Sequence, residues 1–348
     1  MKITDIKKYL TATGELQKEL FAESVRVRKE TIGEDVHFRG IIEFSNYCEK
    51  NCLYCGIRCG NEKAERYRMT KEEIKICLAF IDRVKYGSVV LQSGELTSTK
   101  DKRFLLEIVQ FIHNNYPHLG ITLSCGELDF EFLKELYGAG AHRYLLRIET
   151  SVPSLYKKIH PEHHSLEKRI ETLNDLKKIN YQVGCGNMIG VPEQTIDNLI
   201  SDLNFFQEMD FDMFGLGPYV IHEDTPMGNF ENKKSWEENK EQIFQTTLNF
   251  IAMLRILLPS CNIAAATALD VFKPNGRIQA LKAGANIIMP SVTPQIYRGK
   301  YLLYQNKPCI DEHAEDCSAC TIRQVNAAKL NPVLGTPGNS LHYKQRNI

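Results

Sequence analysis

The sequence predicts an α/β protein built on a (β/α)8 TIM barrel, with a helical extension before the barrel and a second extension after it. Two observations lead to this fold class. Eight short β-rich runs alternate with amphipathic helical segments, a pattern that implies a parallel sheet covered by helices. Eight is also the number of strands that closes such a sheet into a barrel. A doubly wound open sheet is the alternative, since alternation gives the order of the elements and not their closure.

Residues 1–34 predict the N-terminal helical extension, because apolar and charged side chains interleave at helical spacing until Gly33. We expect the barrel over residues 35–300 and the C-terminal extension over residues 301–348. Within the latter, residues 329–348 are rich in Gly, Pro, Asn and Lys and predict an extended or flexible tail. The predicted strands are 37–44, 88–93, 120–125, 143–148, 182–188, 213–218, 262–267 and 285–290. The helices predicted between them include 71–84, 104–114, 166–178, 196–208 and 237–257.

Composition and charge exclude several classes of protein. The 348 residues are 43% hydrophobic and 25% charged, as in ordinary globular proteins, which excludes disorder and collagen. Lysine and arginine number 43, and so do aspartate and glutamate, so no net field attracts a nucleic acid or an acidic membrane. The first residues carry charges throughout, and no apolar window is long enough to cross a bilayer. We therefore expect a cytoplasmic protein that binds neither nucleic acid nor membrane.

The eleven cysteines are concentrated in two groups. In a reducing compartment, clustered cysteines hold metal or take part in catalysis more often than they form disulfides. Four cysteines lie in predicted helices or strands, where we expect small apolar packing residues: Cys77, Cys125, Cys185 and Cys261. The other seven form one group near the start, Cys48, Cys52, Cys55 and Cys59, and one near the end, Cys309, Cys317 and Cys320.

The first group has the spacing C-x3-C-x2-C on one short loop, which can bring three thiolates round a small metal centre. Zinc sites usually pair two separated C-x2-C knuckles, so an iron-sulfur cluster fits this spacing better. Three ligands on a four-iron cluster leave one iron open, which suits a catalyst. Cys59 keeps a second hypothesis open, because a fourth thiolate would close that iron and make the protein a non-enzymatic electron carrier or cluster scaffold.

Active sites of such barrels lie at the carboxyl ends of the strands, so the polar residues that follow each predicted strand are candidates. Two of them, Arg147 and Glu149, are equally compatible with a structural ion pair at a strand end. Arg169 follows two charged residues and is compatible with a solvated helix charge, and the histidines within residues 160–164 are expected to form a solvated turn. Spacing alone does not choose between these roles.

The motif C-x3-C-x-aromatic-C, with Tyr54 as the aromatic residue, resembles the signature of radical S-adenosylmethionine (radical SAM) enzymes. The resemblance implies that Cys48, Cys52 and Cys55 hold a 4Fe-4S cluster whose open iron binds S-adenosylmethionine. One electron then cleaves this cofactor to a 5'-deoxyadenosyl radical that attacks a small-molecule substrate. The resemblance also implies a one-electron reductant, such as ferredoxin or flavodoxin, as a partner.

Longer stretches between about residue 34 and residue 325 are similar to the HydE family of FeFe-hydrogenase maturases. Biotin synthase and methylornithine synthase are more distant relatives, and an enzyme of their type is an alternative. The group Cys309-x7-Cys317-x2-Cys320 resembles one that some HydE members use for a second iron-sulfur cluster. The stretches that carry the similarity are 41–46, 90–95, 143–147, 190–192, 194–195, 211–213, 224–226 and 285–290.

The resemblance also assigns roles to single residues. Glu149 would bond the ribose hydroxyls and Arg169 the methionine carboxylate, which suits a carboxylate acceptor and a forked guanidinium donor. The residues implied for S-adenosylmethionine are Tyr54, Gln92, Ser93, Gly94, Glu95, Ser124, Glu149, Arg169 and Met188. The residues implied for the substrate are Thr122, Arg147, Thr267 and Met289, with Gln92 and Ser124 at the same end of the barrel.

Two positions depart from the family pattern. Ile148 stands where the maturases have a histidine, and Ala266 where they have the first of two threonines. Losing hydrogen-bonding groups beside a cavity changes which ligand the cavity can bind. We expect the radical chemistry to be retained and the substrate to differ. A small molecule with a carboxylate, held by Arg147 and containing sulfur or an amino acid, is the expected ligand class.

Overall fold

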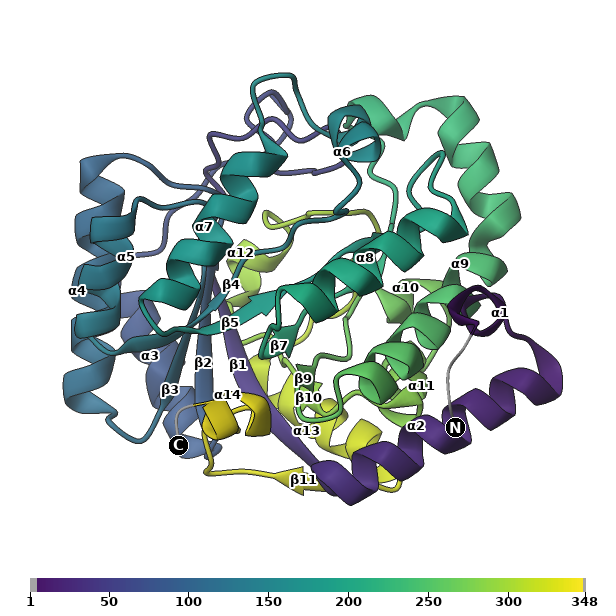
Figure 1. Ribbon diagram of the computed structural model, residues 1–348. Helices are drawn as coiled ribbons and strands as arrows, with labels where there is room; N and C mark the ends of the chain where they lie inside the picture. The colour runs from purple at the N-terminus through teal and green to yellow at the C-terminus, as the bar shows by residue number, and fades with distance from the viewer. Residues whose placement is uncertain (1–4, 347–348) are drawn as a thin grey trace.

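The computed structural model describes residues 5–346, and its centre is a ring of parallel strands (Figure 1). The strands of the ring are β1 (Asp35–Ser45), β2 (Ser88–Ser93), β3 (Gly120–Ser124), β4 (Ala141–Leu145), β5 (Gln182–Cys185), β7 (Met213–Phe214), β9 (Asn262–Ile263) and β10 (Ile287–Ile288). They follow one another in this order, and β10 returns to pair with β1. A parallel bridge between Ala264 and Ile287 joins β9 to β10. The predicted barrel is therefore confirmed, and the open sheet is wrong.

Helices cover the outside of the ring (Figure 1). The predicted helices 166–178 and 196–208 have the same bounds as α7 (Leu166–Lys178) and α8 (Ile196–Glu208). Local capping explains why helices begin where they do: Thr70 and Glu73 form a capping box, in which each side chain accepts from the backbone of the other. The remaining outer helices are α3 (Lys71–Arg83), α4 (Thr99–Asn115), α5 (Phe130–Gly138), α6 (Pro153–Ile159), α9 (Phe230–Leu257), α10 (Leu269–Phe272) and α11 (Gly276–Ala283). A short pair, β6 (Met188–Ile189) and β8 (Gly217–Pro218), extends the rim.

Side chains along the strands alternate between the helices and the barrel interior. A Cβ at Gly40 would lie 2.8 Å from Ile81 of α3, so this face of β1 packs against the helical layer. The opposite face carries Glu43, which the parallel register places beside Gln92 of β2, and Gln92 lies beside Ser124 of β3. The interior at the carboxyl ends of the strands is therefore lined by polar groups.

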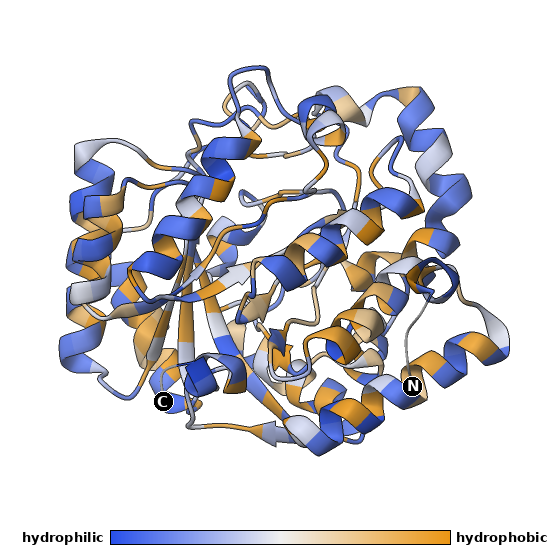
Figure 2. Ribbon diagram, viewed as in Figure 1, coloured by the Kyte–Doolittle hydropathy of each residue, from blue (hydrophilic) through white to orange (hydrophobic). Residues whose placement is uncertain are grey.

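The layer between the strands and the helices is apolar. In Figure 2 the inner faces of the helices are orange where they meet the strands, and the outer faces are blue. The four cysteines predicted to be packing residues, Cys77, Cys125, Cys185 and Cys261, are all buried, which confirms that prediction.

The N-terminal extension forms two helices, α1 (Ile6–Leu10) and α2 (Gly14–Thr31), that pack against the outside of the barrel. The Asn249 amide of α9 donates to the carbonyl of Leu10 and accepts from Gln17. Ser24 Oγ donates to the carbonyl of Ala283 at the end of α11. Residues 1–4 of the predicted extension lie outside the described residues.

Residues 329–348 were predicted to form an extended or flexible tail; the described part is held by hydrogen bonds and is extended at β11, so the flexible form is wrong, and residues 347 and 348 lie outside the described residues. The extension follows α12 (Gln295–Arg298) and contains α13 (Ala314–Ala327), β11 (Asn331–Val333) and α14 (Leu341–Arg346). β11 pairs with β1, and the segment 336–346 then crosses the amino ends of the strands (Figure 1). Composition did not reveal this order, because it comes from contacts with distant strands.

Buried arginines at the amino ends explain why the tail is held. Arg39 and Arg143 lie inside the barrel, and neither has a carboxylate partner within residues 5–346. Arg143 Nη2 donates to the carbonyl of Pro337 at 2.6 Å, and Arg39 Nη2 donates to the carbonyl of Gly338 at 3.2 Å. Burial lowers the pKa of Arg39 to about 10. Buried donors require acceptors, and the tail supplies them.

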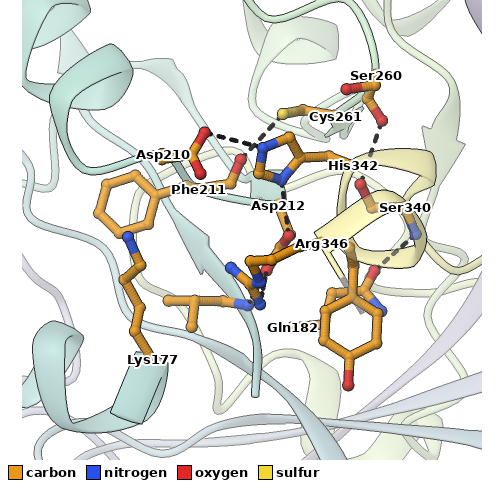
Figure 3. Close-up of polar contacts among 12 residues, drawn as sticks. Lys177, Gln182, Asp210, Phe211, Asp212, Ser260, Cys261, Ser340, His342 and Arg346 are labelled. Atoms are coloured by element: carbon orange, nitrogen blue, oxygen red, sulfur yellow. Dashed lines mark hydrogen bonds and ion pairs between the residues drawn. The ribbon is translucent and has the colours of Figure 1, made fainter. Parts of the chain in front are cut away.

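A histidine anchors the last helix (Figure 3). His342 lies between two carboxylates, with Nδ1 2.9 Å from Asp212 Oδ1 and Nε2 2.8 Å from Asp210 Oδ1. Arg346 Nη2 also reaches Asp212, at 3.1 Å. The hydrogen bond to Asp212 raises the pKa of His342 above its usual value of 6.5.

This contact predicts a pH-dependent attachment of the tail. A raised pKa in the folded state means that His342 stabilises the fold fully below pH 6.5, and that this contribution is lost as the pH rises through the folded-state value. Changing His342→Gln should reduce the free energy of unfolding by about 1.5–3 kcal/mol at pH 5.5 and by much less at pH 9. Denaturant unfolding of both proteins at the two pH values measures this.

The exposed pair His118–Asp82, at 2.9 Å, is the matched control. Changing His118→Gln should alter stability by less than about 1 kcal/mol at either pH, because exposed ion pairs contribute little. An equal loss for the His342 change at both pH values would show that packing, and not the ion pair, holds the tail.

Candidate active site

The loop that carries Cys48, Cys52 and Cys55 follows β1 at the carboxyl end of the barrel. Its backbone is tied to segments far along the chain: Leu53 N donates to Ile159 O, and Gly56 N donates to Leu303 O, both at 3.0 Å. These bonds tie the loop to the barrel mouth.

The thiols of this loop suit a cluster better than a single ion. Cys48, Cys52 and Cys55 are half-buried, whereas Cys59 is exposed. Among the described residues, the sulfurs of Cys48, Cys52 and Cys55 are not all within 4.8 Å of one another. Two sulfurs bound to the same zinc ion lie at most about 4.6 Å apart, so one zinc ion could not bind all three sulfurs in these positions. Burial raises the pKa of Cys52 to about 12, so metal binding must displace its proton.

Four charged side chains form a partly buried network beside this loop, in which Glu95 and Arg169 are buried. Lys50 Nζ lies 3.1 Å from Glu95 Oε1 and 3.0 Å from Glu127 Oε2. Arg169 Nε lies 2.7 Å from Glu127 Oε1, and Arg169 Nη2 lies 3.9 Å from Glu95 Oε2. Burial raises the pKa of Glu95. Arg169 is buried and ion-paired, so the interpretation of a solvated helix charge is wrong.

Glu127 is one of the polar residues that follow a predicted strand and Lys50 lies within the cysteine loop, but the sequence assigned neither of them a role. A signal existed for Glu127: β2 and β3 are both followed by Gly-Glu, at Gly94-Glu95 and Gly126-Glu127. The backbone at Gly94 passes close to the cysteine loop, where an added Cβ would lie 2.2 Å from Tyr47 O. Glycine is therefore required there by space.

Arg147 and Glu149 meet beyond β4. Arg147 Nη2 lies 2.8 Å from Glu149 Oε2 and donates to Asn187 O at 3.0 Å. Glu149 has a φ of 63°, a left-handed conformation that costs energy for a residue other than glycine and that is concentrated at functional sites. Arg147 Nε, Thr122 Oγ1 and Asn187 Oδ1 are buried polar atoms without a hydrogen-bond partner in the described chain. Such atoms leave room for a polar ligand.

The C-terminal extension reaches into the same mouth. Gln92 Nε2 donates to the Tyr301 hydroxyl at 3.2 Å, and Lys307 Nζ lies 2.6 Å from Glu43 Oε1. Tyr301 and Lys307 belong to no motif, and sequence reasoning had no signal for either.

The other predicted site residues around this mouth differ in how exposed their side chains are. Ser93 and Met188 are buried, and Thr267 and Met289 are half-buried beyond β9 and β10. Of the two departures from the family pattern, Ile148 is fully buried in the apolar core. Ala266 is half-buried, with its Cβ facing Gly217. Ala266 is therefore the departure whose surface remains accessible.

Two histidines of the predicted solvated turn are buried instead. His160 and His164 are 3% and 5% exposed, so that interpretation is wrong for both; His163 is exposed as predicted. His160 Nε2 lies 3.4 Å from the Tyr54 hydroxyl, and His164 Nδ1 lies 3.9 Å from Cys52 Sγ. Burial lowers the pKa of His160 to about 3.

The second cysteine group lies where α13 begins. Ligand atoms of Cys309, Glu312 and Cys317 all lie within 4.8 Å of one another. Arg298 Nη1 lies 3.1 Å from Cys317 Sγ and donates to Cys309 O. Cys320 does not belong to this set of three among the residues described, and Glu312 was not predicted.

Comparison with known proteins finds a matching family profile and several relatives. The Radical SAM superfamily profile matches residues 42–206. Over 315 residues the chain is 42% identical to the [FeFe] hydrogenase maturase subunit HydE of Thermotoga maritima, which covers 90% of this chain and 86% of that protein. It is 31% identical over 281 residues to 3-methylornithine synthase of Methanosarcina acetivorans, covering 80% and 75%. The solved structure of methylornithine synthase (PylB) has a TM-score of 0.80 at 26% identity, covering 95% of this chain and 94% of that one.

Among the helices that the structure describes, none is long and apolar enough to cross a membrane. The similarity to HydE spans most of both chains and favours a HydE-like enzyme over the biotin-synthase, methylornithine-synthase and electron-carrier alternatives. Radical SAM enzymes carry a 4Fe-4S cluster, bind S-adenosylmethionine, act on small molecules and need a reductant. The chain belongs to the radical SAM superfamily and is a HydE-like radical SAM enzyme.

Proposed function

We propose that this protein transforms a small carboxylate-bearing molecule that contains sulfur or an amino acid, as a HydE-like maturase or a paralogue of one. The observation that supports this proposal is that Lys50 of the cysteine loop, Glu95 beyond β2, Glu127 beyond β3 and Arg169 of α7 meet in one partly buried network. Four separate segments converge on the place where the carboxylate of the cofactor and the cluster would adjoin.

At the cofactor end, Cys48, Cys52 and Cys55 would hold the cluster. The cluster, when bound, supplies the electron for reductive cleavage of S-adenosylmethionine. Arg169 would pair with the carboxylate of that cofactor and the backbone at Gly94 would meet its amino group. Glu149 uses Oε2 for Arg147, so its other oxygen remains available to accept from the ribose hydroxyls. The remaining residues proposed for this end are Tyr54, Gln92, Ser93, Glu95, Ser124 and Met188.

At the substrate end, we propose Thr122, Arg147, Thr267 and Met289. The unpartnered Thr122 Oγ1 and Arg147 Nε support a ligand with hydrogen-bond acceptors, and a carboxylate would neutralise the guanidinium. Ala266, which carries no hydroxyl, supports a substrate different from that of the maturases. We further propose a cytoplasmic location, ferredoxin or flavodoxin as the reductant, and no nucleic-acid partner, since positive and negative charges balance.

The cluster assignment predicts different results for neighbouring cysteines. After anaerobic reconstitution, Cys52→Ala should abolish formation of 5'-deoxyadenosine, because two thiolates cannot hold the cluster. Cys59→Ala should retain most of it, because Cys59 is exposed. Iron content and 5'-deoxyadenosine are measured together. Loss of the cluster in the Cys59 variant would contradict the assignment of three ligands.

We propose a second metal centre at Cys309, Cys317 and Cys320, with Glu312 as a further ligand. The double change Cys309→Ala/Cys317→Ala should lose part of the iron and still produce 5'-deoxyadenosine. Glu312→Gln and Cys320→Ala should each lower the metal content as well, because each removes one of the four proposed ligands. Complete loss of cofactor cleavage in a folded double variant would place this centre on the catalytic path.

The proposal that the substrate differs from that of the maturases is tested by using this protein in place of HydE. In a hydrogenase maturation assay without its native HydE, this protein should fail to restore hydrogenase activity while it still cleaves S-adenosylmethionine. Ala266→Thr should improve binding of the maturase substrate by about two- to tenfold, since one net hydrogen bond contributes roughly 0.5–1.5 kcal/mol. Full restoration by the unchanged protein would show that the substrate is that of the maturases.

A further inference from the structure

We propose that His164 donates a hydrogen bond from Nδ1 to the sulfur of Cys52 and thereby raises the reduction potential of the cluster held there. The proposal rests on the cluster proposed at Cys48, Cys52 and Cys55, and it adds a residue that no motif assigns. His164 lies in the loop between α6 and α7, over a hundred residues along the chain from Cys52.

Burial and one backbone hydrogen bond position His164 beside Cys52. His164 is 5% exposed, its backbone N donates to Pro161 O at 2.9 Å, and Nδ1 lies 3.9 Å from Cys52 Sγ. The bond fixes the backbone at His164, and its burial encloses the ring beside Cys52. The imidazole is therefore a fixed neighbour of one particular ligand.

The environment of the ring decides which nitrogen carries the proton. His164 Nε2 is buried and has no hydrogen-bond partner among the described residues, so nothing there holds a proton on it. A metal-bound thiolate can only accept. The proton position of an imidazole is set by the bonds that its two nitrogens make, so it belongs on Nδ1, facing Cys52.

The Tyr54 hydroxyl also reaches the same sulfur, but it has a second acceptor. His160 Nδ1 lies 3.0 Å from the carbonyl of Tyr156 and must donate to it. This leaves His160 Nε2 as an acceptor for the Tyr54 hydroxyl, 3.4 Å away. His164 Nδ1, by contrast, faces Cys52 as its acceptor among the residues described.

The other two ligands have backbone donors. Glu95 N donates to Cys48 Sγ at 3.3 Å, and the backbone of Ile57 bonds Cys55. Cys52 differs from these two ligands because the His164 side chain is a donor to its sulfur, and a substitution can remove that donor. Hydrogen bonds to the sulfurs help to set cluster potentials, and the bond is stronger to the more negative, reduced cluster. Removing it should make the cluster harder to reduce.

The experiment is a redox titration of the reconstituted holoenzyme followed by EPR. His164→Leu should lower the ratio of reduced to oxidised cluster at a fixed potential by up to about tenfold, equivalent to about 59 mV for one electron. His164→Asn, whose amide nitrogen takes the place of Nδ1, should restore most of the potential. His163→Leu, a change at the exposed neighbour, should leave it unaltered.

Unchanged potential in His164→Leu with an intact cluster would overturn the proposal, as would equal shifts in His164→Leu and His164→Asn, which would indicate packing alone. Should His164→Leu assemble no cluster, pulsed EPR of the unaltered protein labelled with 15N-histidine decides. Weak coupling to one imidazole supports the hydrogen bond, and absent coupling or the strong coupling of a direct ligand contradicts it. Failure of the unaltered protein to bind a cluster at all would instead refute the proposed function.

Discussion

Arg39 and Arg143 are buried inside the amino end of the barrel, where water cannot solvate their charges and the strands offer no carboxylate among the residues described. A buried guanidinium without acceptors is costly enough to unfold a marginally stable protein. The chain meets this constraint with backbone carbonyls of its own last segment, at Pro337 and Gly338. The tail is therefore part of the barrel, although it is the segment furthest along the chain.

The carboxyl end meets the same constraint in another way. There the cations Lys50 and Arg169 are matched by Glu95 and Glu127, so the network is neutral. The carboxylate proposed to bind Arg169 would add one negative charge to this network. Lys50 holds both glutamates at the same time, so Arg169 could turn part of its guanidinium to the new anion without leaving Glu127 unpaired. The network also ties the cysteine loop to β2, β3 and α7.

Sequence reasoning succeeded where a pattern is local. The cysteine motif indicated the radical SAM superfamily, the bounds of α7 and α8 depend on neighbours a few residues away, and the alternation of strands and helices predicted the barrel. It failed where a residue acquires its role from a distant segment. His164 appeared as a polar turn because its burial comes from the cysteine loop, and a composition rich in glycine and proline hid the contacts of the tail.

The C-terminal extension connects the two ends of the barrel in one continuous path. Tyr301 and Lys307 contact the interior groups Gln92 and Glu43 at the mouth, and the chain then passes through Cys309 and Cys317 before it reaches the amino ends of the strands. Arg298 donates to the carbonyl of Cys309 and to the sulfur of Cys317, so it links the segment around Cys309 to the start of α13. A metal bound between Cys309 and Cys317 would cross-link the extension directly after the segment that covers the mouth. Its contribution would be to order Tyr301 and Lys307 over the substrate end, a structural role that requires no electron transfer.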